Sequence, residues 1–283
     1  MKIEVLERED LAKALELINR EGWNYTASEV ERMLDMDPSG SFWYEDGSRS
    51  GIVTTVTYGR TGVVGHLVVS ENARGQSIGK RLLGSAMEYF ESKHLDSVIL
   101  YAADYAQSFY EKNGFKPDKL VEIRRVHIPN PSRQRAAGSI SRVSKRDIDE
   151  IVAIDEQLFG DSRGELISDL FEDFPEHSWK LVHGNKIEGY ISARGTPVGY
   201  DLGPWVCRSG SVRDAELILD RLLETFSPGG MYVEIFRDNK YACGIVERMD
   251  CIERWPVVLM CRGEPRYRGD VGSVYGIPGV ELG

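Results

Sequence analysis

The sequence predicts a mixed α/β protein (an α+β mixed sheet) made of two similar halves. Three observations support this class: the length of 283 residues, alternating strand and helix patterns, and a restart of the same order of patterns after residue 139. A chain of this length suits two domains of about 140 residues better than one. Its composition, 41% hydrophobic and 28% charged, is typical of a chain that buries real cores.

The first half alternates strands with helices. Apolar residues recur at helical spacing over 10–21 and again over 78–93, which predicts two amphipathic helices. The remaining elements expected here are strands at 3–8, 42–45, 51–58, 63–69, 98–102 and 115–126, and shorter helices at 27–35 and 107–113. This order indicates a mixed sheet covered by helices rather than a repeating βα barrel.

A linker is expected at 129–139, because this stretch is rich in Pro, Ser, Arg and Gly and lacks apolar periodicity. After it, a shift of about 137 residues brings the expected elements of the second half onto those of the first. We therefore expect one domain at 1–128, a second at 140–264 and a tail at 265–283. The tail either folds back over one domain or extends into solvent.

The net charge of −10 is unevenly distributed. Residues 1–135 hold 18 basic and 20 acidic side chains, whereas residues 136–283 hold 17 and 25. An acidic chain without basic clusters argues against a nucleic-acid partner and is compatible with a cationic or amine substrate. No apolar run reaches the roughly 18–20 residues of a membrane helix. Acidic residues stand where a signal peptide would be apolar, so we expect a cytoplasmic protein without a membrane partner.

The four cysteines, Cys207, Cys243, Cys251 and Cys261, all lie in the second half. None forms a C-x-x-C pair, and no histidine stands beside them at zinc-ligand spacing. We expect no metal site and four reduced thiols.

The segment HLVVSENARGQSIGKRLL, residues 66–83, carries the strongest functional signal. A β-branched strand ends at Val69, a polar turn follows, and a helix begins near Ile78. Small residues in such a turn let successive N–H groups point into one concavity at the positive end of the helix dipole, which suits a pyrophosphate. The pattern alone also fits an ordinary turn between a strand and a helix.

A second segment, FYEKNGF at 109–115, predicts a short helix that contains Tyr110 and ends at Gly114. In this order and at this separation, the two segments resemble the GNAT superfamily of acetyl-CoA-dependent N-acetyltransferases. The loop Arg74–Gly79 matches the family's Arg/Gln-x-x-Gly-x-Gly/Ala pattern at its first and last positions. It departs where Ser77 replaces the usual glycine, and since a Cβ restricts positive φ, altered or weaker CoA binding is expected there.

The resemblance covers about residues 1–128 and implies acetyl-CoA as co-substrate. By resemblance, the CoA-binding residues are Leu67, Val68, Val69, Arg74, Gly75, Gln76, Ser77, Ile78, Gly79 and Lys80. The backbone near Val68 would pair with pantetheine and polarise the thioester carbonyl. Tyr110 would protonate or hydrogen-bond the CoA sulfur.

The proton acceptor for the amine is less well defined. His66 lies just before the loop, and its neutral imidazole can take an amine proton through water, so we name it with Tyr110 as a catalytic residue. A packing role for His66, a role for Glu71 and a water relay without a dedicated base remain alternatives.

The second half is expected to be a degenerate copy. Leu100–Phe115 and the end of the chain, 276–283, are similar to a bacterial and archaeal group of tandem GNAT proteins with a divergent second domain. The 137-residue shift places Ser211 at Arg74 and Glu216 at Gly79, and acids there oppose a bound phosphate. It also places Glu247 at Tyr110. This half would bind acceptor, dimerise or act as a brace, and Trp205 would line a pocket or be buried.

The sequence thus predicts an N-acetyltransferase that transfers an acetyl group directly, in a ternary complex, to a primary amine. The acceptor is expected to be a small molecule or peptide, and the protein a monomer or homodimer. The alternative is an acyl-CoA-binding or regulatory module without productive catalysis.

Overall fold

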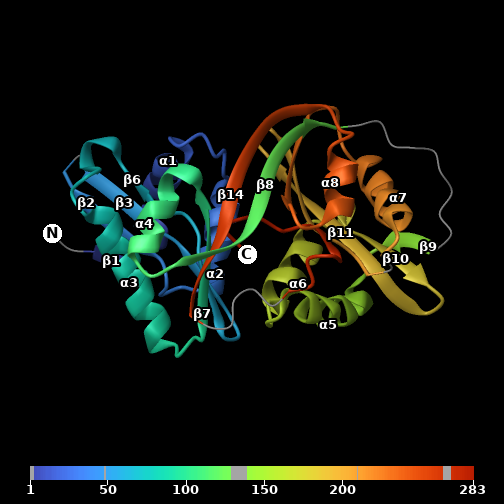
Figure 1. Ribbon diagram of the computed structural model, residues 1–283, viewed down its shortest axis with the longest axis horizontal. Coiled ribbons are helices and arrows are strands. Elements are labelled where there is room, and N and C mark those ends of the chain that lie inside the picture. The colour runs from blue at the N-terminus through green and yellow to red at the C-terminus, as the bar shows by residue number, and fades with distance from the viewer. Residues whose placement is uncertain (1–2, 48, 129–138, 209, 264–268) are drawn as a thin grey trace.

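The computed structural model of the protein describes residues 3–47, 49–128, 139–208, 210–263 and 269–283. The expected linker at 129–139 lies outside these residues except for Ser139, as does the start of the expected tail. The described residues confirm a mixed α/β architecture with two halves, which lie on either side of two long crossing strands (Figure 1).

The first half contains four helices and eight strands among its described residues. The helices are α1 (Leu11–Asn19), α2 (Ala27–Met36), α3 (Ile78–Ser92) and α4 (Gln107–Lys112). The strands are β1 (Ile3–Val5), β2 (Phe42–Asp46), β3 (Arg49–Val53), β4 (Thr55–Tyr58), β5 (Thr61–Val64), β6 (Val68–Val69), β7 (Ser97–Ala103) and β8 (Lys116–His127). The apolar face of α3 packs on the sheet, as its spacing predicts. At the start of α2, Thr26 and Glu29 form a capping box.

The second half repeats this order of elements. Its helices are α5 (Ile148–Phe159), α6 (Gly164–Asp173), α7 (Val212–Leu223) and α8 (Lys240–Val246). Its strands are β9 (Ser139–Arg142), β10 (Trp179–His183), β11 (Lys186–Thr196), β12 (Gly199–Cys207), β13 (Gly230–Phe236), β14 (Cys251–Gly263) and β15 (Val274–Gly276).

The expected strands 51–58 and 63–69 are each broken in two, which the sequence analysis did not predict. β3 and β6 belong to one sheet, of order β1-β2-β3-β6, while β4 and β5 belong to a second. The second sheet has the order β4-β5-β7-β14-β8-β13-β12-β11-β10-β9, and β15 pairs with β12. The breaks fall at Thr54 and at residues 65–67, and such short interruptions of an apolar run are also found inside continuous strands.

The two halves exchange their long strands. β14 of the second half pairs with β7 and β8 of the first, while β8 of the first half pairs with β13 and β14 of the second. Each half therefore supplies a strand that the other half's sheet surrounds. The exchange joins both halves into one sheet across the molecule (Figure 1).

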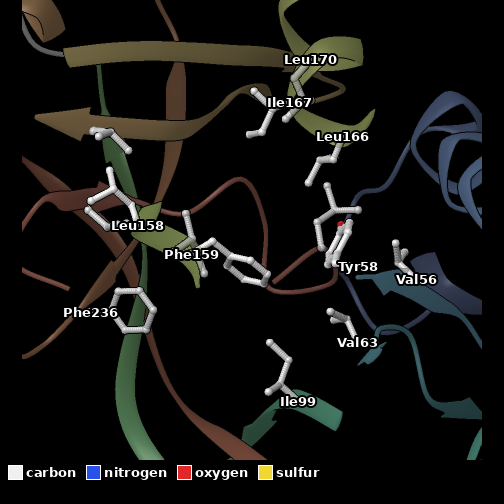
Figure 2. Close-up of a cluster of buried hydrophobic side chains, with 14 of the residues drawn as sticks. Val56, Tyr58, Val63, Ile99, Leu158, Phe159, Leu166, Ile167, Leu170 and Phe236 are labelled. Carbon is white, nitrogen blue, oxygen red and sulfur yellow. The ribbon is translucent and has the colours of Figure 1, made fainter. Parts of the chain in front are cut away.

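One hydrophobic cluster spans the boundary between the halves. Tyr58, Val63 and Ile99 of the first half pack in the same cluster as Leu158 and Phe159 of the second (Figure 2). Ring centroids of Tyr58 and Phe159 are 5.7 Å apart, with the rings edge to face. The two halves therefore share a hydrophobic core. They are not packed as independent domains, although the composition of the linker suggests a domain boundary.

The described part of the tail, residues 269–283, folds back into the molecule. β15 pairs with β12, and Ile277 and Leu282 belong to the shared core. The backbone oxygen of Gly283 accepts a hydrogen bond from Arg163. Of the two expectations for the tail, the folded-back one is correct for these residues. Among the described residues, no helix is long and apolar enough to cross a membrane.

Candidate active site

The site begins where two neighbouring strands of the first half bend apart. β5 runs parallel to β7 from Thr61 to Val64, and then the chain leaves that sheet and re-enters the other as β6. Thr54, at the break between β3 and β4, holds the bend: its Oγ1 accepts the His66 N–H at 2.9 Å, and its carbonyl accepts the Gly65 N–H at 2.9 Å. β6 is the edge strand of its sheet. Its outward backbone groups therefore face the divergence.

A pocket of about 430 Å³ opens between the end of β6, the loop 70–77 and α4. This volume lies within the roughly 300–1,000 Å³ typical of small-ligand sites. Its lining comprises Val69, Ala73, Arg74, Gly75, Ser77, Ile78, Gly79, Lys80, Phe109, Lys112 and Asn113.

The loop before α3 curls as the sequence suggested. It has a positive φ at Gly75 and also at Ser77, the position where the loop departs from the family pattern. Gly75 has φ +76°, and a Cβ there would have no atom within 4 Å. Ser77, the N-cap of α3, also adopts the left-handed region with φ +62°. A non-glycine residue there costs about 1 kcal/mol, so Ser77 preserves the loop's shape at some expense in strain.

Positive charge surrounds this pocket. Lys80 in the first turn of α3 and Lys112 at the end of α4 both line it. Arg74 lies on the loop, where its Nε donates to the Val69 carbonyl at 3.0 Å and its guanidinium pairs with Glu21. Together with the free N–H groups at the start of α3, these side chains suit an anion of the size of a pyrophosphate.

Tyr110 is almost completely buried behind this pocket. It packs edge to face against Phe109, with ring centroids 5.1 Å apart, and against Phe115 at 5.9 Å. Burial, with a smaller effect of Tyr105, raises the pKa of Tyr110 above its ordinary value. The phenol is therefore protonated at any functional pH and is able to donate a proton or hydrogen bond.

His66 is also buried, at 2% exposure, on the other side of the bent strand. Its Nδ1 lies 3.1 Å from Thr54 Oγ1, and its Nε2 has no hydrogen-bond partner among the described residues. Burial lowers the pKa of His66 to about 3. The imidazole is neutral, as the sequence analysis expected, but so low a pKa makes it a weak proton acceptor.

The structure brings seven of the predicted CoA-binding residues to the pocket: Val69, Arg74, Gly75, Ser77, Ile78, Gly79 and Lys80. Leu67, Val68 and Gln76 do not line it, nor do Tyr110 and His66. Leu67 packs toward α3, while Val68 packs among the residues of α1 and α2. The sequence analysis missed four lining residues: Ala73, Phe109, Lys112 and Asn113. The sequence motif around Tyr110 could have indicated Phe109, Lys112 and Asn113, because these residues lie on or directly after the same short helix, α4.

The equivalent divergence in the second half is closed by the tail. β12 runs parallel to β13 from Gly199 to Leu202, and beyond this point β15 pairs with β12 instead. The Ile277 N–H donates to the Glu234 carbonyl of β13 at 3.0 Å, so the tail contacts both strands. A Cβ on Gly203 would lie 1.9 Å from the Ile277 carbonyl oxygen, which shows how closely the tail approaches. Trp205 is fully buried there and lines no open pocket.

The loop of the second half is also shorter. β11 begins 137 residues after β3, whereas α7 begins at Val212, 134 residues after Ile78 of α3. The correspondence of Tyr110 with Glu247 is therefore wrong: Tyr110 is the fourth residue of α4, and Cys243 is the fourth residue of α8. The correspondence of Gly79 with Glu216 is wrong for the same reason, because Gly79 is the second residue of α3 and Arg213 is the second residue of α7. At the start of α7, the Asp214 side chain lies 3.2 Å from His183. A carboxylate at this helix start opposes a bound phosphate.

Comparisons with known proteins agree with this geometry. Residues 38–117 and residues 151–276 each match a family described as "Acetyltransferase (GNAT) domain". Holothin acyltransferase from Pseudoalteromonas sp. (strain SANK 73390) is 26% identical over 273 residues, which cover 93% of this chain and 88% of the relative.

Solved structures share the whole fold. A putative acetyltransferase from Pyrococcus horikoshii has a TM-score of 0.81 at 19% identity, covering 100% of this chain and 95% of the other. A tandem GNAT protein from the clavulanic acid biosynthesis pathway has a TM-score of 0.65 at 12% identity, covering 93% and 98%.

The fold and the two matches define an acyltransferase architecture that occurs twice in one chain. The protein belongs to the GNAT superfamily, with two GNAT domains in tandem. Its second copy lacks the long loop and the open strand edge of the first.

Proposed function

We propose that the protein transfers an acetyl group from acetyl-CoA to the primary amine of a small molecule or peptide, with both substrates bound together. One observation carries the proposal: the pocket of the first half lies at the free edge of β6, the strand whose backbone pairs with pantetheine in this family. The pyrophosphate would bind at Gly75 and Ser77 beside Lys80 and Lys112, and pantetheine would extend along β6.

The chemistry requires a neutral amine. Its nitrogen forms a bond to the thioester carbonyl carbon, the carbon–sulfur bond breaks, and the thiolate leaves with a proton from Tyr110, which is then replenished from solvent. Starting from an ammonium ion, the amine nitrogen gives up two protons and the thiol gains one, so each turnover releases one proton. The N–H groups of the bent strand would stabilise the oxyanion. The core that the two halves share would fix the halves relative to each other, so that the two substrates stay close together.

The relative's name supplies a first acceptor to test, namely holothin. Acetyl-CoA should raise the melting temperature of the full chain, and release of CoA thiol should increase with holothin or with a primary amine such as benzylamine. A thermal shift without amine-dependent thiol release would instead support the acyl-CoA-binding module. Absence of any shift with acetyl-CoA or longer acyl-CoA esters would contradict both proposals.

A further inference from the structure

A buried cluster of charged side chains lies between the two halves, on the opposite side of the bent strand from the pyrophosphate pocket. It combines Tyr25 and Glu29 of the first half with residues of the second. These are Arg194 on β11, Asp201 on β12, Glu234 on β13 and Glu281 in the tail. We call these six residues the acidic cluster.

The acidic cluster holds more acidic groups than basic ones. Four carboxyl groups surround the single guanidinium of Arg194, which pairs with Asp201, lies 3.6 Å from Glu281 Oε1 and lies 3.9 Å from Glu29 Oε1. Arg194 is 2% exposed and Glu281 is 4% exposed. Buried carboxylates without enough cationic partners are costly, so carboxyl groups in such a cluster either hold protons or bind an additional cation.

Several of its oxygen atoms have no partner. Glu234 is 6% exposed, and its Oε2 accepts no hydrogen bond from the described residues. The same holds for Asp201 Oδ1 and for Glu281 Oε1, whose contact with Arg194 is an ion pair without a hydrogen bond. Buried polar atoms in proteins almost always have partners, so these oxygens indicate a bound group that donates hydrogen bonds.

The acidic cluster adjoins the strand that leads into the active site. The Tyr25 hydroxyl donates to Glu281 Oε2 at 2.7 Å, and the Tyr25 ring lies edge-on to the His66 ring with centroids 4.2 Å apart. The Glu281 carbonyl oxygen would lie 3.3 Å from a Cβ on Gly65. Trp23, 42% exposed and 6.0 Å from the His66 ring, lies at the solvent side of this contact.

We infer that the acidic cluster binds the acceptor amine as an ammonium ion, which then loses a proton before it attacks the thioester, with Glu234 and Glu281 as its principal ligands. The inference rests on the proposed function and specifies its acceptor as a cationic amine that approaches past Trp23 and Tyr25. An ammonium ion carries three N–H donors and one positive charge, which match the unpartnered oxygens and the excess of carboxyl groups. The second half thereby supplies the acceptor site, while the first half supplies the donor site.

The ionisation of the two glutamates agrees with this assignment. Burial raises the pKa of Glu281 to about 7 and the pKa of Glu234 well above its ordinary value. The groups that face them are Tyr25, Glu29, Tyr58, Arg194 and Asp201, and Arg194 is the only cation among these. A bound ammonium would favour the ionised carboxylates, so its binding should release protons.

The test is calorimetric titration of the full chain at pH 7, with and without bound CoA. The probes are benzylamine and its uncharged analogue benzyl alcohol, each titrated in two buffers of different ionisation enthalpy. The wild type is expected to bind benzylamine at least ten times more tightly than the alcohol and to release protons only with the amine. Glu234→Gln and Glu281→Gln should each reduce the preference to less than threefold.

Glu156→Gln is the matched control, because Glu156 is an exposed carboxylate on α5 of the same half. It should keep the full preference, and all variants should keep the acetyl-CoA thermal shift, which reports folding and the donor site. Equal or absent binding of the two probes by the wild type would overturn the inference, as would an equal loss in Glu156→Gln. Loss of the acetyl-CoA shift in the wild type would contradict the proposed function instead.

Discussion

In each half of the molecule, two parallel strands run together for four residue pairs and then diverge. In the first half the pairs are Thr61↔Ser97 to Val64↔Leu100, and in the second they are Gly199↔Gly230 to Leu202↔Val233. Beyond this point β6 of the first half keeps a free edge beside a pocket, whereas β12 of the second half pairs with β15. The same backbone geometry therefore leaves an open pocket in one copy and is covered by the chain's own tail in the other.

The second half shows that this fold can be kept without an open pocket beside the diverging strands. The second half keeps the divergence, but a segment of its own chain makes the hydrogen bonds that a ligand would make. The shorter loop before α7 and the Asp214 carboxylate then complete the change.

Substitutions of the loop glycines in the two halves should differ most strongly in their effect on acyl-CoA affinity. Gly75→Glu introduces a carboxylate where the pyrophosphate is expected, and it strains the backbone because Gly75 has a positive φ, so acyl-CoA affinity should fall at least a hundredfold. The measurement is the dependence of melting temperature on acetyl-CoA concentration. Gly210→Glu is the matched control, because Gly210 also has a positive φ, +64°, and open space at its Cβ position. Equal losses of affinity in both variants would contradict the assignment of the donor site to the first half.

The corresponding helices α4 and α8 provide the next contrast. Tyr110→Phe removes the proposed proton donor while it keeps the buried ring, so kcat should fall by about 10- to 100-fold with little change in the KM for acetyl-CoA. Cys243→Ala, at the matching position of α8, should leave both constants unchanged. Steady-state thiol release measures both variants. An unchanged kcat in Tyr110→Phe would exclude this residue as the proton donor.

The tail that closes the second divergence also introduces Glu281, and its ionisation should affect stability. Because the folded-state pKa is raised from 4.5 to about 7, the folded protein holds this proton more tightly than the unfolded chain. Its contribution is therefore present below pH 4.5 and is lost as the pH rises to about 7. Glu281→Gln should be more stable than the wild type at pH 8, by about 1–3 kcal/mol, and nearly equal at pH 4.5.

Denaturant unfolding at pH 4.5, 6 and 8 measures this difference, with Glu156→Gln as the control. His66 has the opposite sign: its pKa is lowered to about 3, so its contribution is lost as the pH falls from 6.5 toward 3. A Glu281→Gln variant with the same pH dependence as the wild type would show that this carboxyl ionises normally.

The smallest effect is expected at Ser77. Ser77→Gly relieves the left-handed strain at the start of α3, and the gain is partly offset by the greater freedom of glycine in the unfolded chain. The free energy of unfolding should rise by up to about 1 kcal/mol. Ser211→Gly is the contrasting variant, because Ser211 has φ −90° and its side chain accepts from Asp214 N, so it should lose stability. A destabilised Ser77→Gly variant would show that the hydroxyl group has another role.

Local features of the chain were predictable, and contacts between distant segments were not. The loop at Gly75 and the helix from Ile78 follow from residue types within a few positions of each other. The bends at Thr54 and His66 lie at polar positions within strand-like segments, and the tertiary hydrogen bonds that hold them are not visible in the sequence. The acidic cluster joins Tyr25 to Glu281 across nearly the whole chain, and no local pattern connects them.

The exchanged strands constrain the order in which the sheet can form while the protein is synthesised on the ribosome. β7 and β8 are complete when residue 127 has been synthesised, but the strand that lies between them, β14, ends at Gly263. Elongation proceeds at roughly 5–20 residues per second, so the first half waits on the order of ten seconds for its missing strand. During this time the facing edges of β7 and β8 are unpaired, and unpaired strand edges are templates for pairing with another chain.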